Sequence, residues 1–459
     1  MLSSAARQSM SGSSPSVFLM ISVGLTFAVV GLGLGLAAAY GSRNLRTRQP
    51  LQAENPAEPW MWREDWKQGR CNSRTKPAMI QAWAFAILCN LIASPTLFVI
   101  PRAMQQQPLA VLGFLFPLAG IGLLIRALRF TLAWLEFGVT WFEMTATPLA
   151  IGCEFRGNVQ ARFPHGADHG VRLKLSCVNR MVTGTGKSET VTEKILWRDE
   201  KSVSSAELCP GPLGTLIPVS FRVPWNSLPT DGSNPRNAIL WLLEADADVP
   251  GVNYKDIFEL PVFRTKDTPA SPAAETIREQ PAFTAPSQHT VVVTPTAEGS
   301  EFYFPAARNP RFAMGVTTFS MLWSGVVALI IYLHAPLIFP VVFGFFDLLL
   351  LTGAAQLWLA TSRVKVDCSS IRVQTGLLGG GRWREYPKSQ ILDIQAVITA
   401  QQGGATGTPY YDIQLLQTEH QNVTLGRTIR DKDEAEWLVS EMRKALKLRA
   451  AAAAAGNSF

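Results

Sequence analysis

The sequence has few of the residue patterns that mark catalytic or metal-binding sites. Its six cysteines form no C-x-x-C pair and show no regular spacing, so neither a zinc site nor a disulfide framework is indicated. The five histidines are scattered, and neither an H-E-x-x-H nor a G-x-S-x-G motif occurs. We therefore expect no catalytic residues, no cofactor and no metal site, and we do not expect an enzyme.

Charge is also sparse, and its distribution argues against a nucleic-acid partner. Charged residues make up 17% of the chain, and the 42 Lys and Arg exceed the 35 Asp and Glu by a net +7. No run of basic residues is interleaved with aromatics, as a nucleic-acid surface would require. Basic loops beside a membrane produce the same modest excess. Membrane lipids are therefore the expected partners, together with a protein partner that the sequence does not identify.

What the sequence does contain is long apolar segments. A helix needs about 20 apolar residues to cross the hydrocarbon layer. Five segments qualify, and none has the polar stripe of a soluble core helix: residues 17–40, 79–100, 109–125, 314–333 and 337–359. The first ends in Ala37-Ala38-Ala39, but its apolar run is longer than the roughly 7–15-residue apolar core of a signal peptide, and it is interpreted as an uncleaved anchor.

Basic residues predict the orientation of these helices. The loop at 41–78 carries many Arg and Lys, whereas the N-terminal tail contributes Arg7 and the loop after the second segment Arg102. Because basic loops stay on the cytoplasmic side, the N-terminus is expected outside and the C-terminus inside. The same rule places the regions 126–311 and 361–459 in the cytoplasm.

The region 141–264 follows the three N-terminal segments (residues 1–140) and is predicted to be an all-β sandwich. Short alternating apolar runs are broken by Gly, Pro and Asn, which is the two-residue period of strands. The predicted strands are 153–162, 171–179, 191–197, 216–223, 238–245 and 257–264.

A linker and a second soluble module complete the organisation. Residues 265–310 are rich in Pro, Ala and Thr and are expected to form a linker, although 291–293 and 302–304 are candidates for short strands. After the two helices of 311–360, residues 361–450 are predicted as a small α+β domain whose final helix starts near Asp431, with Glu434 completing a capping box. Residues 451–459 are expected to be a disordered tail.

Three resemblances follow from these patterns. The strand order that opens at Gly152-x-x-x-x-Gly157 and includes Ile217–Pro224 is similar to arrestin-like sandwiches, which implies a protein-binding surface; a generic sandwich is the alternative. The region 366–394 and the final helix resemble bacterial pleckstrin-homology-like domains. Pro59–Trp66 and the first half of the chain resemble a family of bacterial multi-pass inner-membrane proteins of uncharacterised activity, which implies the topology and a bacterial inner membrane.

Polar residues inside the predicted spans are candidate functional groups. Asp347 lies near the middle of the last segment, where an ionisable group is costly unless it faces protein or water. Asn90 in the second segment is a possible partner, and together they form the candidate intramembrane polar site. The alternative is that Asp347 is hydrogen-bonded to a neighbouring helix and serves packing alone.

Two further features point to the bilayer. The segment with Trp60, Trp62, Arg63, Trp66 and Lys67 combines aromatic and basic side chains, and these are candidate lipid-interface anchors; a plain juxtamembrane loop is the alternative. In the first segment, small residues at Gly31-x-x-x-Gly35 permit close helix contact, either within the chain or in a homo-oligomer.

Two motifs invite other readings. Gly184-Thr-Gly-Lys-Ser188 resembles a phosphate loop but lacks its first glycine, because Met181 stands there, and a hairpin turn is expected. His165, Asp168 and His169 are close in sequence, but the surrounding Pro and Gly favour an exposed loop rather than metal ligands.

The sequence thus predicts a multi-domain membrane protein with about five transmembrane helices, a sandwich and a pleckstrin-homology-like domain. The expected function is a scaffold or adaptor that presents cytosolic β-rich modules to proteins or lipid headgroups. The alternative is a transporter or channel component that uses Asp347.

Overall fold

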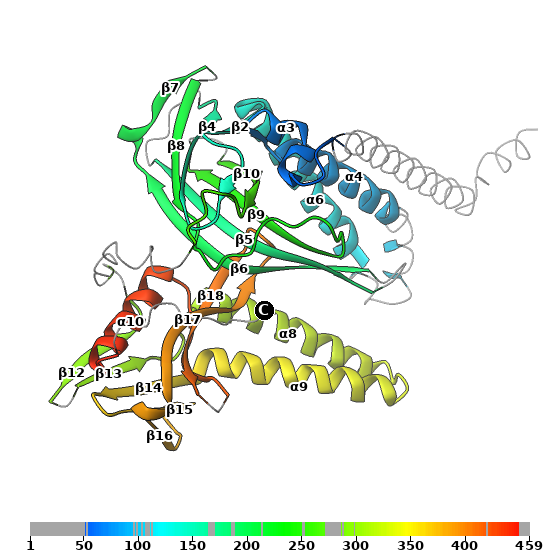
Figure 1. Cartoon of the computed structure of the whole chain (residues 1–459). Coiled ribbons are helices and arrows are strands. Elements are labelled where there is room, and N and C mark those ends of the chain that lie inside the picture. Colours follow the sequence, from blue (N-terminus) through cyan, green and yellow to red (C-terminus); the bar gives the residue numbers. More distant parts are fainter. Residues whose placement is uncertain are drawn as a thin grey trace, which may run out of the picture. The chain divides into compact units, whose positions relative to one another are not determined.

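The structure is a computed structural model that describes most of the chain. The described residues run from 51 to 448, except for 52–53, 95–96, 98–99, 102–103, 106–110, 112, 164–169, 185–188, 213, 250–252, 271–285, 287–288, 298 and 419–420. The predicted span 17–40, its Gly31/Gly35 motif, the His165–His169 cluster, most of the Gly184–Ser188 motif and the tail 451–459 lie outside this range. The chain divides into two compact units (Figure 1). The first contains residues up to Arg180 together with Arg198–Thr268, and the second contains Met181–Trp197 and the chain from Pro269 onward.

Four helices in the described part of the chain are long and apolar enough to cross a membrane. They are α4 (Thr75–Ala93), α6 (Leu115–Phe137), α8 (Pro310–Tyr332) and α9 (Ile338–Leu359). Each corresponds to one of the predicted segments. The shorter helical elements are η1 (Pro59–Trp62), α3 (Glu64–Lys67), η4 (Ser205–Glu207), η5 (Lys388–Gln390) and α10 (Lys432–Ala445).

The third apolar helix extends beyond its predicted end. It was expected to end at residue 125, but α6 continues to Phe137, where Gly138 with a φ of +70° stops it. Arg126 and Arg129 end the apolar run without ending the helix, since arginine is a good helix former and extends its charge toward the interface.

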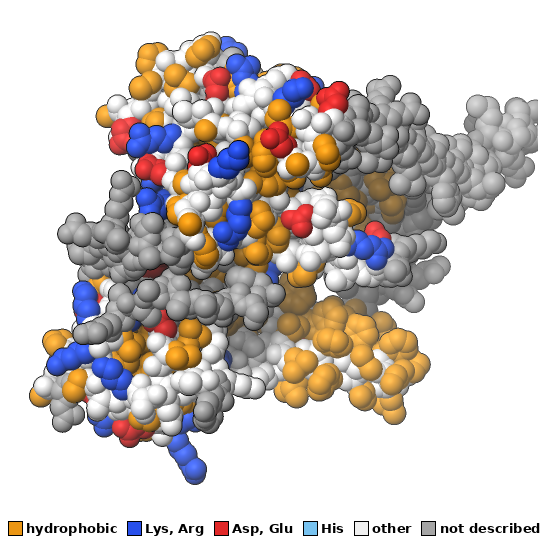
Figure 2. Space-filling model, in the orientation of Figure 1, with side chains coloured by type: hydrophobic (Ala, Val, Ile, Leu, Met, Phe, Trp, Pro, Cys, Tyr) orange, Lys and Arg blue, Asp and Glu red, His pale blue; other side chains and the backbone are white. Residues whose placement is uncertain are grey.

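The surface of these helices is apolar and exposed. At most 11% of each 18-residue apolar window is buried, and Leu337 and Phe116 are 82% and 69% exposed. Figure 2 shows hydrophobic side chains along α8 and α9, with no charged side chain on the face in view. A contiguous apolar surface of this size is unfavourable in water and suits a lipid environment.

The first unit contains a β-sandwich, except that the connected ends of two of its strands, within Met181–Trp197, belong to the second unit. One sheet has the order β1-β2-β4-β8-β7, the other β10-β9-β5-β6, and β11 pairs with β3 in parallel. The strands are β1 (Arg70–Asn72), β2 (Trp141–Met144), β3 (Leu149–Ala150), β4 (Glu154–Ala161), β5 (Val171–Thr183), β6 (Thr190–Val203), β7 (Cys209–Gly211), β8 (Gly214–Arg222), β9 (Asn237–Ala247), β10 (Tyr254–Leu260) and β11 (Val262–Phe263). Every strand predicted in this region is present.

Aromatic side chains build the core of the sandwich. Phe155 lies between Phe142 and Phe221, with ring centroids 6.5 and 6.2 Å apart, and all three rings are nearly or fully buried. Each comes from a different strand of the first sheet, so inward-facing residues of β2, β4 and β8 form one cluster. This packing follows the alternation seen in the sequence.

A buried carboxylate joins the first helix pair to the sandwich. Asp256 in β10 accepts hydrogen bonds from the hydroxyl groups of Ser73, Thr75 and Thr140, which flank the start of α4 and the end of α6. Burial raises the pKa of Asp256, and the three hydroxyl bonds oppose that shift. The helix pair is therefore attached to the sandwich by side chains as well as by the chain itself.

The second unit contains two further sheets and a covering helix. Their orders are β12-β13-β14-β15-β16 and β17-β18-β19. The strands are β12 (Val292–Thr296), β13 (Gly299–Phe304), β14 (Ala360–Asp367), β15 (Ser370–Leu377), β16 (Trp383–Pro387), β17 (Ile391–Gln402), β18 (Thr408–Gln417) and β19 (Val423–Ile429). The predicted linker 265–310 thus contains two strands, β12 and β13, at the positions of the candidate strands.

Both helix pairs are inserted into a sheet in the same way. Helices α4 and α6 lie in the chain between β1 and β2, which pair antiparallel. Helices α8 and α9 lie between β13 and β14, which also pair antiparallel. Each pair of apolar helices is therefore connected at its two ends to neighbouring strands of one sheet. These two connections hold the β-rich module at one end of the helix pair.

Helix α10 begins as predicted but with a different cap. Asp431 accepts a hydrogen bond from the Asp433 N–H at 2.9 Å. Glu434 does not close a capping box. Its carboxylate instead accepts hydrogen bonds from the backbone N–H groups of Thr290 and Val291, because the chain before β12 passes over the start of α10.

Candidate functional site

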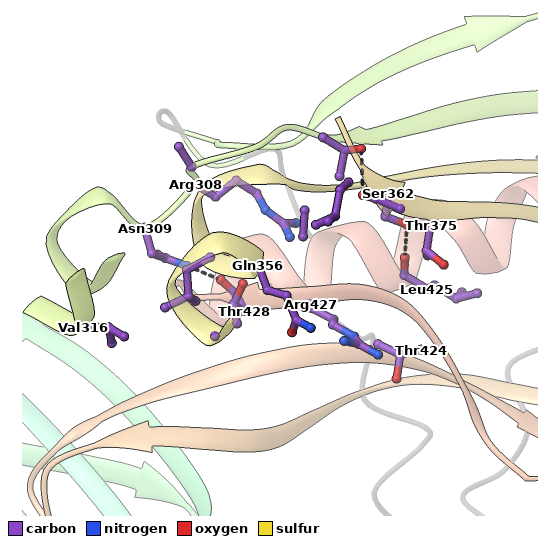
Figure 3. Close-up of a pocket in the computed structure, with 17 residues that line it drawn as sticks. Arg308, Asn309, Val316, Gln356, Ser362, Thr375, Thr424, Leu425, Arg427 and Thr428 are labelled. Atoms are coloured by element: carbon purple, nitrogen blue, oxygen red, sulfur yellow. Dashed lines mark hydrogen bonds between the residues drawn. The ribbon is translucent and has the colours of Figure 1, made fainter. Parts of the chain in front are cut away.

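The candidate site is a pocket where the second helix pair joins its sheets (Figure 3). Two hydrogen bonds tie this junction to β19. The Asn309 Nδ2 group, just before α8, donates to the Thr428 carbonyl at 2.6 Å, and the Ser362 hydroxyl in β14 donates to the Leu425 carbonyl at 2.7 Å. The start of α8 and the chain after α9 are thereby both held against one strand.

The pocket has a volume of about 570 Å³ and a mixed lining. Two guanidinium groups, from Arg308 and Arg427, line it, and Figure 3 shows Arg427 lying alongside Gln356 of α9. Hydroxyl groups come from three strands, and apolar side chains of α8, α9 and β15 complete the wall. The further lining residues are Asn309, Thr361, Ser362, Thr375, Thr424, Thr428, Val316, Leu357 and Leu377.

Arg308 is the least satisfied polar group of the pocket. Its guanidinium carbon lies 5.2 Å from the centre of the Phe304 ring, and its Nη1 atom is buried without a hydrogen-bond partner among the described residues. Burial lowers the pKa of Arg308 to about 10, although the negative charges of Asp412 and Glu434 act to raise it. A guanidinium stays protonated at neutral pH even so, and its buried donor is therefore available to an anion.

Asp412 is a buried acid whose charge acts on both arginines of the pocket. Asp412 is 8% exposed, and one of its oxygens accepts a hydrogen bond from the Thr428 N–H at 2.8 Å. Burial raises the pKa of Asp412, while that backbone bond and the charges of Arg427 and Arg308 act to lower it. The surroundings of the pocket therefore combine two cations, two buried acids (Asp412 and Glu434) and several hydroxyl and amide donors. Such a donor set suits a phosphate group.

The predicted intramembrane residues each have a partner within their own helix pair. The Ser324 hydroxyl in α8 donates to Asp347 in α9 at 2.8 Å. The Asn90 amide in α4 donates to the Gly120 carbonyl in α6 at 2.9 Å and to the Ala86 carbonyl at 2.8 Å. The two residues belong to different units. These contacts agree with the packing alternative for Asp347.

The predicted lipid-interface anchors make contacts with the sandwich. Trp66 is 5% exposed, and its indole N–H donates to the Glu259 carbonyl at 3.1 Å. Arg63 pairs with Glu259 at 3.1 Å and lies 4.2 Å over the Trp66 ring. Trp60 packs on Phe263 with ring centroids 5.3 Å apart. Burial corrects the expectation for Trp66, because a side chain enclosed by protein cannot lie among headgroups.

The other members of that segment are less enclosed. The Trp62 indole N–H donates to the Asn55 carbonyl at 2.8 Å, and Lys67 is exposed. A second pocket of about 510 Å³ lies beside Trp62 and Trp66. Its Arg63 is already paired with Glu259, so this pocket offers a less available cation than the first.

Sequence reasoning missed the Arg308–Arg427 pocket. In the sequence, Arg308 has only the pattern of a basic residue that precedes an apolar segment, and Arg427 only that of a residue in an alternating, strand-like run. One signal was present: a basic residue directly before an apolar span, followed by Asn and Pro, in Arg308-Asn309-Pro310. The pairing of β13 with β14 across the helix pair, which brings Arg308 beside β19, has no local signature.

Comparisons with known proteins give little. No protein-family model and no curated protein matches the chain. Among solved structures, it is similar to the crystal structure of Spo0M, sporulation control protein, from Bacillus subtilis, with 11% identity over 55% of this chain and 90% of that chain and a TM-score of 0.20. A TM-score this low carries no argument about fold or function. The function is therefore argued from the pocket and the helices.

Proposed function

We propose that the protein is an integral inner-membrane scaffold or adaptor whose second β-rich module binds the phosphate of an anionic lipid headgroup. The observation that carries this proposal is the buried Nη1 of Arg308, which has no hydrogen-bond partner in the described part of the chain and lies in a pocket lined by the start of α8 and the end of α9. These helices are apolar enough to span a bilayer, so the pocket opens at the depth where headgroups lie.

The way in which the helices are inserted supports a scaffold. Each helix pair connects two adjacent strands of a sheet, so neither module is joined to its helices by a long linker. A module attached at both ends is held close to the bilayer surface, where it can present strand edges and loops to a protein partner. The resemblances to arrestin-like and pleckstrin-homology-like folds favour binding over catalysis, although fold alone does not decide function.

The distribution of charge supports a cytosolic placement in a bacterial inner membrane. Arg308 precedes α8, Arg311 is the second residue of α8, Arg363 follows α9, and Arg74 precedes α4. Both ends of the second helix pair and the start of the first thus carry basic residues, and basic flanks stay on the cytoplasmic side. With the predicted first span 17–40, the chain would cross the membrane five times, with the N-terminus outside.

The test measures lipid-dependent stability of the full chain. The protein is reconstituted in nanodiscs of phosphatidylcholine, with and without phosphatidylglycerol, and its thermal unfolding midpoint is recorded. A ligand that binds only the folded state raises the midpoint. We expect phosphatidylglycerol to raise it for the wild type, and Arg308→Gln and Arg427→Gln to lose most of this rise.

The matched control is Arg311→Gln. It removes an exposed charge at the start of the same helix, outside the pocket, and should keep the full rise. Loss of the same size in all three variants would mean that lipid acts through general surface charge. An unchanged rise in Arg308→Gln and Arg427→Gln would also refute the proposed headgroup site.

A further inference from the structure

The turn between β15 and β16 lies level with the end of a membrane helix. Leu377, the last residue of β15, is paired with Ala360, the first residue after α9. The Leu378 N–H donates to the carbonyl of Leu359, the last residue of α9, at 2.8 Å. The turn is therefore bonded directly to the end of the apolar helix.

Large apolar side chains project from this turn. Leu377 is 51% exposed, Leu378 is 74% exposed, and Trp383 at the start of β16 is 44% exposed. We call these three residues the hairpin tip. Their side chains lack protein cover, and solvent-exposed turns normally carry polar residues instead.

The backbone holds the hairpin tip in one conformation. Leu378 has a φ of +53°, a region that leucine rarely adopts, and hydrogen bonds fix it there. The Gly379 N–H donates to the Thr361 hydroxyl at 2.9 Å, and the Gln374 side chain donates to the Gly381 carbonyl at 3.0 Å. The left-handed backbone of Leu378 costs conformational free energy, and the hydrogen bonds of the turn hold the residue in this conformation with its side chain exposed.

Basic side chains surround the hairpin tip. Arg382 and Arg384 flank Trp383 in sequence and are exposed, and the Lys365 ammonium lies 5.3 Å from the Trp383 ring. Leu377 is paired with Ala360 at the end of α9, whereas Trp383 is paired with Gln374 and Arg384 with Val373, farther along the sheet from that helix. Leucine nearest the apolar helix, followed by tryptophan and then arginine, is an order that occurs across a membrane interface.

We infer that the hairpin tip inserts into the cytoplasmic leaflet beside α9, with Leu377 and Leu378 among the acyl chains and Trp383, Arg382 and Arg384 at headgroup depth. The occupant of this surface is lipid rather than protein because the tip is bonded to the end of a membrane-spanning helix. The inference rests on the membrane placement within the proposed function, through α8 and α9, and needs no ligand in the Arg308 pocket.

The test measures the depth of a spin label in the full-length protein. The accessible cysteines Cys89, Cys153, Cys209 and Cys368 are first replaced by serine. A nitroxide is then attached at Leu378→Cys, and collisions with oxygen, which concentrates in lipid, are compared with collisions with a water-soluble nickel chelate. The protein is reconstituted in phosphatidylcholine vesicles, so that anionic headgroups are not required.

Two control positions bracket the result. Leu349→Cys reports on lipid, since Leu349 lies within α9 and is 53% exposed. Leu392→Cys is a matched leucine, 56% exposed, at the start of β17, whereas it is the other end of β17, at Ala400, that pairs with Tyr410, the neighbour of Phe312 in α8. We expect the oxygen-to-nickel ratio at Leu378→Cys to exceed that at Leu392→Cys several-fold and to approach that at Leu349→Cys.

Other outcomes would overturn the inference. A ratio at Leu378→Cys equal to that at Leu392→Cys would place the hairpin tip in water. Shielding from both agents, with dipolar broadening between labels, would place it against a second copy of the chain. Leu377→Cys, in extended backbone, repeats the measurement without the left-handed residue. Because no anionic lipid is used, failure here is separable from failure of the headgroup site.

Discussion

The Asn90 side chain donates a hydrogen bond to the backbone carbonyl of Gly120 at 2.9 Å and joins α4 to α6. A Cβ atom at Gly120 would overlap the Asn90 amide, whereas nothing lies within 4 Å of a Cβ atom added at Gly122, two residues further along α6. The glycine thus permits the close approach on which the bond depends. Small residues have this role in helix packing within membranes.

Gly120→Ala is therefore expected to push Asn90 away and to separate the two helices. The lost bond and packing should cost about 1 to 2 kcal/mol, less any gain in helix propensity. Thermal unfolding in detergent should show a lower midpoint for Gly120→Ala than for Gly122→Ala, which adds the same methyl group without a clash. Equal midpoints would show that the contact does not contribute to stability.

Features with a periodic or hydropathic signal could be predicted from the sequence. The four described apolar helices overlap the predicted segments, the six strands predicted in the region 141–264 are present, and α10 starts at the predicted cap Asp431. These signals are local, because a span needs only apolar length and a strand only alternation.

Features that depend on distant pairing could not be predicted. Strand β1, Arg70–Asn72, has three residues and becomes a strand only by pairing with β2 beyond two helices. Glu434 has the spacing of a capping box, but its carboxylate accepts hydrogen bonds from the backbone N–H groups of Thr290 and Val291 instead. Arg308 and Arg427 line the same pocket only because β13 pairs with β14 across α8 and α9. The candidate site therefore required the structure, whereas the membrane helices did not.

Removing the Glu434 carboxylate should loosen the chain before β12. Glu434→Ala leaves the Thr290 and Val291 N–H groups without an acceptor, and the Val291 side chain is fully buried. Loss of bonds to a charged acceptor costs roughly 2 to 3 kcal/mol. Hydrogen exchange measured by mass spectrometry should show faster exchange in residues 289–296.

A matched variant on the same helix separates this effect from loss of charge. Glu441→Ala removes a carboxylate whose ion pair with Lys444, at 2.7 Å, is at the surface, and should leave exchange in residues 289–296 unchanged. Equal exchange in Glu434→Ala and the wild type would show that the Glu434 carboxylate does not hold the chain before β12 in place.

Glu259 should make the first unit sensitive to acid. Burial acts to raise the pKa of Glu259, but the charges of Arg63 and Arg74 outweigh burial and hold it below the ordinary glutamate value. A carboxyl with a lowered pKa in the folded state stabilises the protein above the unfolded-state pKa of about 4.3, and this stability is lost as pH falls through the folded-state value.

Glu259→Gln should therefore lower the unfolding midpoint at neutral pH and reduce its decline in acid. We expect a loss of about 1 to 2 kcal/mol at pH 7, because the partner Arg74 is partly exposed. The control is Glu143→Gln, whose pair with Arg70 at 3.6 Å is solvent-exposed and should contribute little at any pH. A parallel pH profile for the wild type and Glu259→Gln would refute this account.

Substitutions of Asp347 can distinguish a role in helix packing from a role in transport. The Ser324 hydroxyl donates to its carboxylate, and the side-chain oxygen of asparagine can accept the same bond. Asp347→Asn should therefore leave the unfolding midpoint and its rise with phosphatidylglycerol unchanged, whereas Asp347→Leu, which removes the acceptor, should cost about 0.6 kcal/mol. A pH-sensitive dye enclosed in proteoliposomes provides the opposing measurement. A proton flux in the wild type that disappears in Asp347→Asn would mean that the carboxylate takes up protons, because asparagine preserves the hydrogen bond and removes only the titratable group.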